Sequence, residues 1–120
     1  MSKMQREKGK RGERLWRDKC REQGYTEVRR TSQYCGQTGD ASDCVGLPGI
    51  HQEVKFVEKL NVRNALEQAV NDSHGKAIPI VAHKTSNCEW LVTMRADDWF
   101  NIYKEWELAY TAKMMMEGKM

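Results

Sequence analysis

Three charged residues in the string SDCVGLPGIHQEVK have types and spacings that could do chemistry. Glu53 and Lys55 are separated by one residue, so on a β-strand they project from the same face. Pro48 and Gly49 suit the centre of a type II turn, and the hairpin they predict brings Asp43 close to Glu53. Neighbouring carboxylates repel unless a cation lies between them, and Mg²⁺ is commonly held by carboxylates, waters and phosphate oxygens. A lysine beside such an ion would orient a water or stabilise charge on phosphorus, which favours phosphodiester hydrolysis.

The same residues also have a purely structural interpretation. The pattern Asp-x9-Glu-x-Lys is loose, and a Glu-x-Lys pair on an exposed strand is often a solvated ion pair. The context favours catalysis, because the acids span a hairpin with a Pro-Gly turn. A helix carrying Glu13 among cations precedes the hairpin, and a helix with Gln68 at the edge of its apolar face follows it.

Periodicity and turn residues predict the elements that must position these side chains. The first helix is expected from near Glu7 to just before Gly24, preceded by a flexible basic arm at residues 1–7. Strands are expected at Tyr25–Arg30, Asp43–Leu47, Ile50–Val57, Ala77–His83 and Glu89–Met94. A polar, glycine-containing loop, Thr31–Ser42, joins the first two strands.

Two further helices complete the predicted order. A helical spacing of i, i+3, i+4, i+7 and i+8 is formed by Val62, Ala65, Leu66, Ala69 and Val70. Asn61 is its expected N-cap, and Gly75 closes it. The third helix is expected at 97–113, followed by an unassigned tail at 114–120. The order α-β-β-β-α-β-β-α predicts a mixed α/β or α+β domain around one sheet.

Length and composition restrict the class of protein. A chain of 120 residues, 39% hydrophobic and 31% charged, is expected to form one globular domain. The basic N-terminus lacks the apolar segment of a secretory signal, and no apolar run approaches a membrane span, so a cytoplasmic protein with no membrane partner is expected. No structural zinc is expected, because no metal-ligand spacing joins the three histidines to Cys20, Cys35, Cys44 and Cys88.

Positive charge is concentrated at the start of the chain. Residues 1–30 hold 11 basic and 5 acidic residues, whereas the remaining 90 hold 9 and 12. On a helical wheel, one stripe of the first helix gathers Lys10, Arg14, Arg17 and Arg21. Glu13 falls between this stripe and the apolar face. The stripe indicates a face for a polyanion, with a solvated basic helix as the alternative.

The chain resembles the PD-(D/E)xK nuclease superfamily, and more narrowly the archaeal-type Holliday junction resolvases and their phage-encoded relatives. The resemblance runs from about Lys8 to Trp106 through four strings: KGKRGERLWRDKCREQGY, GDASDCVGLPGIHQEVKFVEKLN, ALEQA and WLVTMRADDWF. It implies a restriction-endonuclease-like core and a phage or prophage protein acting in the host cytoplasm. Ser42 stands where the superfamily name has proline, and the loop Thr31–Ser42 departs from the archaeal pattern, which leaves the choice of substrate open.

The resemblance assigns roles residue by residue. Asp43 and Glu53 match the two metal-binding acids, Lys55 the catalytic lysine, and Glu13 a further acid of the metal site. The backbone carbonyl of Val54 is a further metal ligand by analogy, and Gln68 matches a supporting glutamine found after the Glu-x-Lys strand. The cofactor implied is Mg²⁺, with Mn²⁺ as a substitute, and the products implied are a 5′-phosphate and a 3′-hydroxyl.

The implied substrate is branched or duplex DNA. The residues expected to hold its phosphates are Lys10, Arg14, Arg17, Arg21, Arg29 and Arg30. Such contacts give salt-sensitive affinity without reading sequence. Ser32 matches a serine near the archaeal site. Tyr34 is a candidate for stacking on an exposed base, with an ordinary loop tyrosine as the alternative.

Paired cuts in a four-way junction need two active sites, so the resemblance implies a homodimer. A candidate interface on the third helix is the stripe Trp99, Ile102, Tyr103, Trp106 and Tyr110. We expect Trp99 and Tyr103 to pack on the chain's own sheet instead, and leave the other aromatic residues open. Alternatives for the whole chain are a nicking or flap-type nuclease, a restriction-like enzyme, a nucleic-acid-binding module without catalysis, and a redox or zinc protein.

Overall fold

The computed structural model describes residues 2–31 and 42–119. Three helices and five strands lie within these ranges: α1 (Lys3–Glu22), β1 (Arg29–Arg30), β2 (Cys44–Val45), β3 (Ile50–Phe56), α3 (Val62–Ser73), β4 (Ile78–Lys84), β5 (Leu91–Met94) and α4 (Ala96–Met116). This confirms the predicted α/β class and the order of the described elements. None of the described helices is long and apolar enough to cross a membrane.

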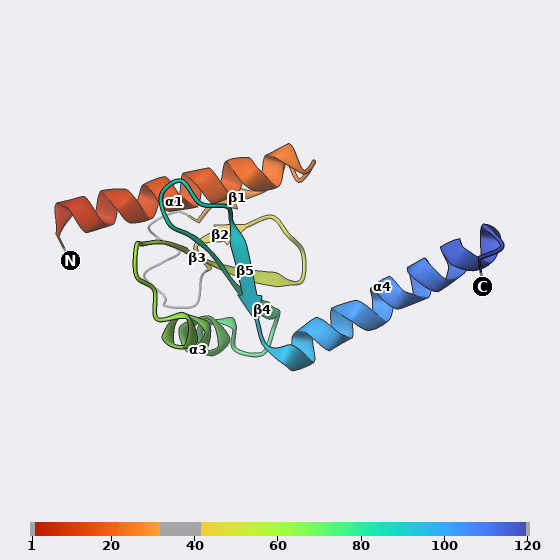
Figure 1. The fold of residues 1–120 in the computed structure, drawn as a ribbon. Helices are drawn as coiled ribbons and strands as arrows, with labels where there is room; N and C mark the ends of the chain where they lie inside the picture. The colour runs from red at the N-terminus through yellow and green to blue at the C-terminus, as the bar shows by residue number, and fades with distance from the viewer. Residues whose placement is uncertain (1, 32–41, 120) are drawn as a thin grey trace.

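The five strands form one mixed sheet in the order β1-β2-β3-β4-β5. Only β3 and β4 run parallel, with Glu53 beside Val81 and Lys55 beside His83. The helices α1 and α3 lie on opposite faces of this sheet (Figure 1). Val54 packs in the cluster that contains Trp16 of α1, whereas Val81 packs against Ala69 of α3. Strand alternation therefore turns Glu53 and Lys55 toward the α3 face.

Helix α1 approaches the sheet closely because a glycine stands at the contact. A Cβ atom built on Gly12 would lie 2.6 Å from the Cβ of Phe56 on β3. One turn further along, the Trp16 indole N–H donates a buried 2.8 Å hydrogen bond to the side-chain oxygen of Gln52. These two contacts fix the rotation of α1 over β3, and with it the direction in which Glu13 points.

The first helix begins earlier than expected. Ser2 and Gln5 form a capping box, in which each side chain accepts a hydrogen bond from the other residue's backbone N–H. The helix therefore starts at Lys3, and residues 3–7 belong to it instead of forming a flexible arm.

Helix α4 differs most from the expectation. It projects away from the sheet (Figure 1) and contains no buried residue. Trp99 is 48% exposed and Tyr103 is 37% exposed, so the expectation that they pack on their own sheet is wrong. The physical reason is the connection: β5 ends at Met94 and Arg95 is already the N-cap of α4, which leaves no loop to fold the helix back. The helix continues to Met116 and absorbs the first three residues of the expected tail.

Candidate functional site

Asp43 is held in place by the backbone at the start of the hairpin. Its N–H donates to the Gln52 carbonyl at 2.8 Å, and its own carbonyl accepts from the Thr31 N–H at 3.0 Å. The side-chain Oδ2 accepts a 2.8 Å hydrogen bond from the Val54 N–H. The predicted turn is present, with the Ile50 N–H donating to the Leu47 carbonyl. The hairpin therefore places Asp43 beside the strand that carries Glu53.

The electrostatics of Asp43 are unfavourable for a carboxylate. Burial and the neighbouring charge of Glu53 raise its pKa to about 8, and the charge of Glu13 adds to the shift. The hydrogen bond from the Val54 N–H opposes this rise in pKa. Three carboxylates from α1, the β2 hairpin and β3 thus act on one another. A divalent cation is the ordinary means of stabilising such a group in its ionised form.

Glu53 has a partner that sequence reasoning did not identify. Its Oε1 lies 2.9 Å from His51 Nε2, and both side chains are buried. His51 and Glu53 stand at i and i+2 on the strand, so alternation places them on one face, and this spacing is the signal that the sequence contains. The histidine orients the Glu53 carboxylate from within the same strand.

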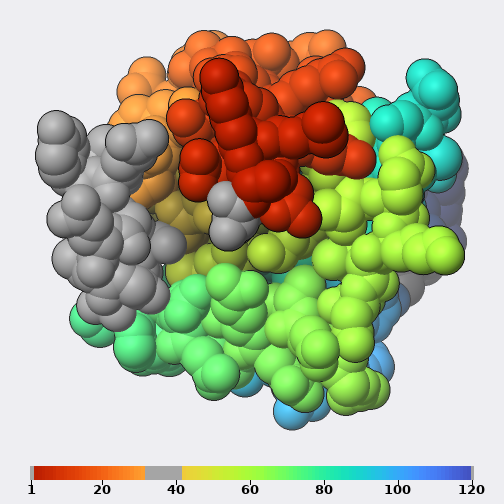
Figure 2. Space-filling view, turned by 90° about the vertical axis from the view of Figure 1, so that its left-hand side faces the viewer, coloured from red at the N-terminus to blue at the C-terminus, as the bar shows by residue number. Residues whose placement is uncertain are grey.

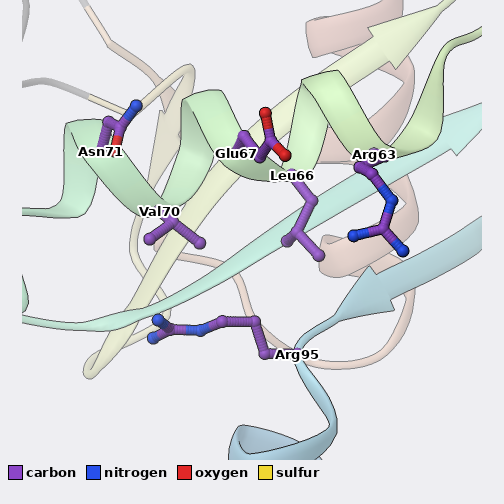
Figure 3. Close-up of a pocket in the computed structure, with 6 residues that line it drawn as sticks. All are labelled: Arg63, Leu66, Glu67, Val70, Asn71 and Arg95. Atoms are coloured by element: carbon purple, nitrogen blue, oxygen red, sulfur yellow. The ribbon is translucent and has the colours of Figure 1, made fainter.

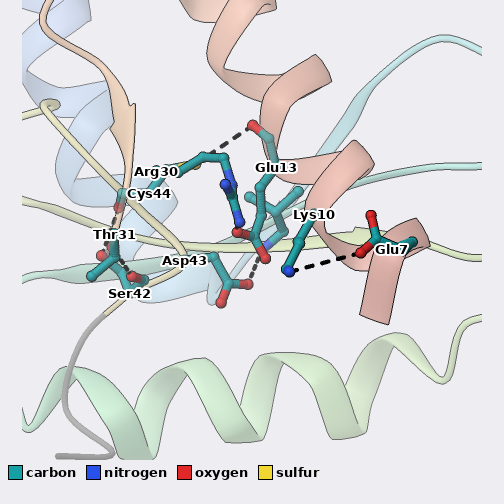
Figure 4. Close-up of polar contacts among 9 residues, drawn as sticks. Glu7, Lys10, Glu13, Arg30, Thr31, Ser42, Asp43 and Cys44 are labelled. Atoms are coloured by element: carbon teal, nitrogen blue, oxygen red, sulfur yellow. Dashed lines mark hydrogen bonds and ion pairs between the residues drawn. The ribbon is translucent and has the colours of Figure 1, made fainter. Parts of the chain in front are cut away.

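Glu13 and Arg30 form the matching contact on the other side of the site. Arg30 Nε donates to Glu13 Oε1 at 3.1 Å, and Figure 4 shows this pair beside Asp43. Arg30 was expected to hold a DNA phosphate. In this structure its Nε engages Glu13, and its positive charge offsets the charge of that carboxylate. A contact of Arg30 with DNA stays a prediction.

Lys55 is half-buried on β3, one residue past Val54. Its ammonium makes no hydrogen bond or ion pair with any residue in the described ranges. The N–H and C=O of a strand residue point to the same side, so we expect the Val54 carbonyl to face the Asp43 side as well. Gln68, the expected supporting residue, is exposed on α3. Within residues 2–31 and 42–119 it makes no hydrogen bond with the acids, whereas the Gln52 carbonyl accepts from the Asp43 N–H.

The donor set suits a hard cation, although its geometry is not that of a closed metal site. Among residues 2–31 and 42–119, no group of three or more His, Cys, Asp or Glu side chains is arranged to hold an ion. The ion-pair contacts explain this arrangement, because Arg30 engages Glu13 and His51 engages Glu53. Carboxylate and carbonyl oxygens from Asp43, Glu53 and Val54 fit Mg²⁺ or Mn²⁺ by their chemistry.

The basic stripe lies on α1, the helix that carries Glu13, and its cations make only a few local contacts. Lys10 lies 3.8 Å from Glu7, and Arg14 is exposed. Arg17 pairs with its neighbour Asp18, while Arg21 donates to the backbone carbonyl of Val28. Figure 2 shows the adjoining side of the molecule, where α1 and α3 border a hollow whose floor has the colours of β2 and β3.

The remaining expected DNA contacts are divided between described and undescribed parts of the chain. Arg29 is exposed on β1 and donates to the Glu27 carbonyl. Ser32 and Tyr34 lie outside the described residues.

A second group of cations was missed from the sequence. Three positive groups surround the ring of Phe56: Lys8 Nζ at 5.4 Å, Arg11 Cζ at 5.6 Å and Lys84 Nζ at 5.7 Å from its centroid. Lys8 also lies 3.9 Å from Glu58. We call these three cations the Phe56 cluster. It continues the positive surface of α1 to the end of β3, one residue beyond Lys55.

A shallow groove of about 460 Å³ lies elsewhere, between α3 and the start of α4 (Figure 3). It is lined by Arg63, Leu66, Glu67, Val70, Asn71 and Arg95. None of the three interacting carboxylates contributes to it, so the groove is not part of the candidate site.

Comparison with family models, curated proteins and solved structures found no match for this chain, so the site rests on its own residues.

Proposed function

We propose that this protein is a metal-dependent endonuclease with a restriction-endonuclease-like core, acting on branched DNA and most specifically on four-way junctions. One observation carries the proposal: Asp43 is held beside Glu53 and Glu13 with its pKa raised by burial and by their charges, and Lys55 stands two residues from Glu53 on the same strand. Metal-assisted hydrolysis of a phosphodiester needs acidic metal ligands and a nearby lysine. The three carboxylates repel one another, and Lys55 makes no ion pair within the described residues.

The topology supports this proposal. An antiparallel hairpin carries the two acids and the lysine, and helix α1 supplies the third acid. Helix α3 then connects β3 to β4, which runs parallel to it. This is the order that the resemblance implies for the nuclease core.

Each residue then has a defined task. Asp43, Glu53 and the Val54 carbonyl would hold Mg²⁺ or Mn²⁺ with Glu13 alongside, and the bound ion supplies Lewis acidity toward the scissile phosphate. Lys55 orients the attacking water or neutralises charge that develops on phosphorus. His51 and Arg30 fix the rotamers of Glu53 and Glu13, as partners of metal ligands commonly do.

The substrate follows from the charged surface. The α1 stripe and the Phe56 cluster both offer cations to phosphates, and such contacts recognise backbone shape instead of base sequence. A flap or nicking nuclease uses the same site. A binding module without catalysis is favoured by one observation, the engagement of Glu13 and Glu53 by Arg30 and His51.

Cleavage of an end-labelled four-way junction and of its matching linear duplex, with Mg²⁺ and with EDTA, tests the proposal. Paired symmetric nicks that require Mg²⁺ and are confined to the junction support a resolvase. Cleavage of both substrates supports a nuclease of broader choice. Binding without cleavage, repeated with Mn²⁺ and flap substrates, would leave the binding module as the function.

A further inference from the structure

Helix α4 carries an exposed aromatic surface that its own domain does not cover. The rings of Trp99 and Tyr103 stack at 5.3 Å, those of Tyr103 and Trp106 lie 5.5 Å apart, and those of Trp106 and Tyr110 stack at 4.8 Å. Each of these four side chains is between 37% and 52% exposed. We call them the aromatic ladder. It runs along a helix of 21 residues, about 31 Å long at 1.5 Å per residue.

The aromatic ladder occupies one side of the helix only. Its residues follow one another at spacings of four, three and four, which is the period of a helix–helix seam. Ile102 and Met114 flank the same side on a 100° wheel. Lys104 and Glu105 fall on other faces, and Leu108 lies opposite the ladder. The ladder side is therefore aromatic along its centre, whereas the opposite side mixes charged residues with the exposed Leu108.

The exposed area is large for a monomer. Aromatic side chains bury about 150–250 Å² each when covered. At the exposures found for the ladder and for neighbouring Phe100, five rings present roughly 450 Å² of surface. A standard interface buries about 800 Å² on each partner, so the ladder with its flanking residues supplies more than half of one side.

The charges at the two ends of the seam are self-complementary. Arg95 stands at its start, where it forms a 2.9 Å ion pair with Asp98, and Glu117 stands at its end, where it lies 3.2 Å from Lys119. If two copies of α4 lie antiparallel, the Arg95 end of one copy lies beside the Glu117 end of the other, so these two side chains can pair across the seam. A parallel arrangement would bring like charges together at both ends. Antiparallel packing also opposes the two helix dipoles favourably.

We propose that α4 docks on α4 of a second copy of this chain, antiparallel about a two-fold axis between Tyr103 and Trp106. In this register Trp99 meets Tyr110 of the other copy, and Tyr103 meets Trp106. The contact is isologous and closes on itself, so it yields a dimer and not a fibre. The inference does not rest on the proposed nuclease activity, because it concerns a helix that contributes nothing to the carboxylate site.

Sedimentation equilibrium of the purified full chain, without DNA, tests the dimer. Wild-type protein is expected at twice the 14.0 kDa chain mass at micromolar concentrations. Replacement of Tyr103→Ala with Trp106→Ala is expected to weaken association at least 100-fold, because central aromatic residues carry most of the energy of an interface. Leu108→Ala, on the opposite side of the same helix, is the matched control and is expected to leave the dimer intact.

The orientation is tested by charge reversal. Glu117→Arg is expected to weaken the dimer several-fold, and combining it with Arg95→Glu is expected to restore it, because only antiparallel helices pair these two positions. Failure of the double variant to restore association would overturn the antiparallel register. A wild-type monomer at 100 µM, or a dimer insensitive to the Tyr103 and Trp106 changes, would overturn the proposal. Sedimentation of that monomer with anionic phospholipid vesicles would assign the ladder to a lipid surface.

Discussion

The Asp43 carboxylate accepts a 2.8 Å hydrogen bond from the Val54 N–H, one residue beyond Glu53 on β3. The bond ties the end of the hairpin to the strand that carries the other site residues. It fixes Asp43 where its charge and that of Glu53 act on each other, so the hairpin stores electrostatic repulsion that a bound cation would relieve.

Burial of Asp43 and its repulsion by Glu53 should make the metal-free protein less stable as pH rises. Because its pKa is raised from 3.8 to about 8, the folded protein binds this proton more tightly than the unfolded chain between those values. The contribution of Asp43 to the free energy of unfolding is therefore complete below pH 3.8. It falls as pH rises toward 8, by at most about 1.4 kcal/mol per pH unit. Urea unfolding in EDTA at pH 5.5 and 8 measures the change.

Asp43→Asn identifies the group responsible for that slope. The variant is expected to flatten the loss of stability between pH 5.5 and 8, because the amide does not titrate. Asp97→Asn, at an exposed position of α4, is the control and should keep the wild-type slope. An unchanged slope in Asp43→Asn would mean that another group carries the titration.

Loss of Glu53 or Lys55 should abolish cleavage and spare DNA binding. Glu53→Ala and Lys55→Ala are each expected to lower kcat at least 100-fold, because each removes a charge that acts in the transition state. Glu67→Ala on the exposed side of α3 is the matched control. Single-turnover cleavage and filter binding of the same junction separate the two effects. Near-normal turnover in either site variant would remove the proposed site.

His51 should act by positioning Glu53. His51→Ala is expected to raise the Mg²⁺ concentration for half-maximal activity about 10-fold, since partners of metal ligands typically contribute 10- to 100-fold. His51→Gln, which can still donate to Glu53 Oε1, should recover part of this loss. Exposed His74→Asn serves as the control, because asparagine tolerates the left-handed conformation of this C-cap. An unchanged Mg²⁺ dependence in His51→Ala, with wild-type stability, would restrict His51 to packing.

The α1 stripe and the Phe56 cluster should each contribute to the salt dependence of DNA binding, which a merely solvated surface charge would not. Arg14→Ala with Arg17→Ala, and separately Lys8→Ala with Arg11→Ala, are each expected to weaken binding equally across sequences. Each lost phosphate contact should reduce the slope of log K against log salt by about 0.9. Fluorescence anisotropy between 50 and 200 mM salt measures the slopes. A wild-type slope in either pair would exclude that surface from the DNA interface.

Two glycines of α1 should respond in opposite directions to the same substitution. Gly12→Ala places a Cβ 2.6 Å from the Cβ of Phe56 and is expected to destabilise the fold by about 1–3 kcal/mol. Gly9→Ala meets nothing within 4 Å and should stabilise it by about 0.5–1 kcal/mol through helix propensity. Thermal unfolding compares the two. Equal effects would show that Phe56 does not limit the approach of α1.

Local periodicity was enough to predict the elements around the site. The alternation in β3 placed Glu53 and Lys55 on one face, and Asn61 caps α3 as expected, with its side chain accepting from the Asn64 N–H. The Pro-Gly turn is likewise present, with Gly49 at a positive φ of 85°. These features depend on contacts within a few residues, so their information lies in short stretches of sequence.

The tertiary structure alone decided what the site residues contact and where α4 points. Arg30 and Glu13 form their ion pair although they lie 17 positions apart in the sequence. From the sequence alone, Arg30 is an equally good candidate for a DNA contact. The aromatic stripe of α4 was visible in the sequence, but its periodicity is the same whether a helix packs on its own sheet or extends from it. The direct joining of β5 to α4 at Arg95 sets that direction, because a helix can fold back only where a loop allows the chain to reverse.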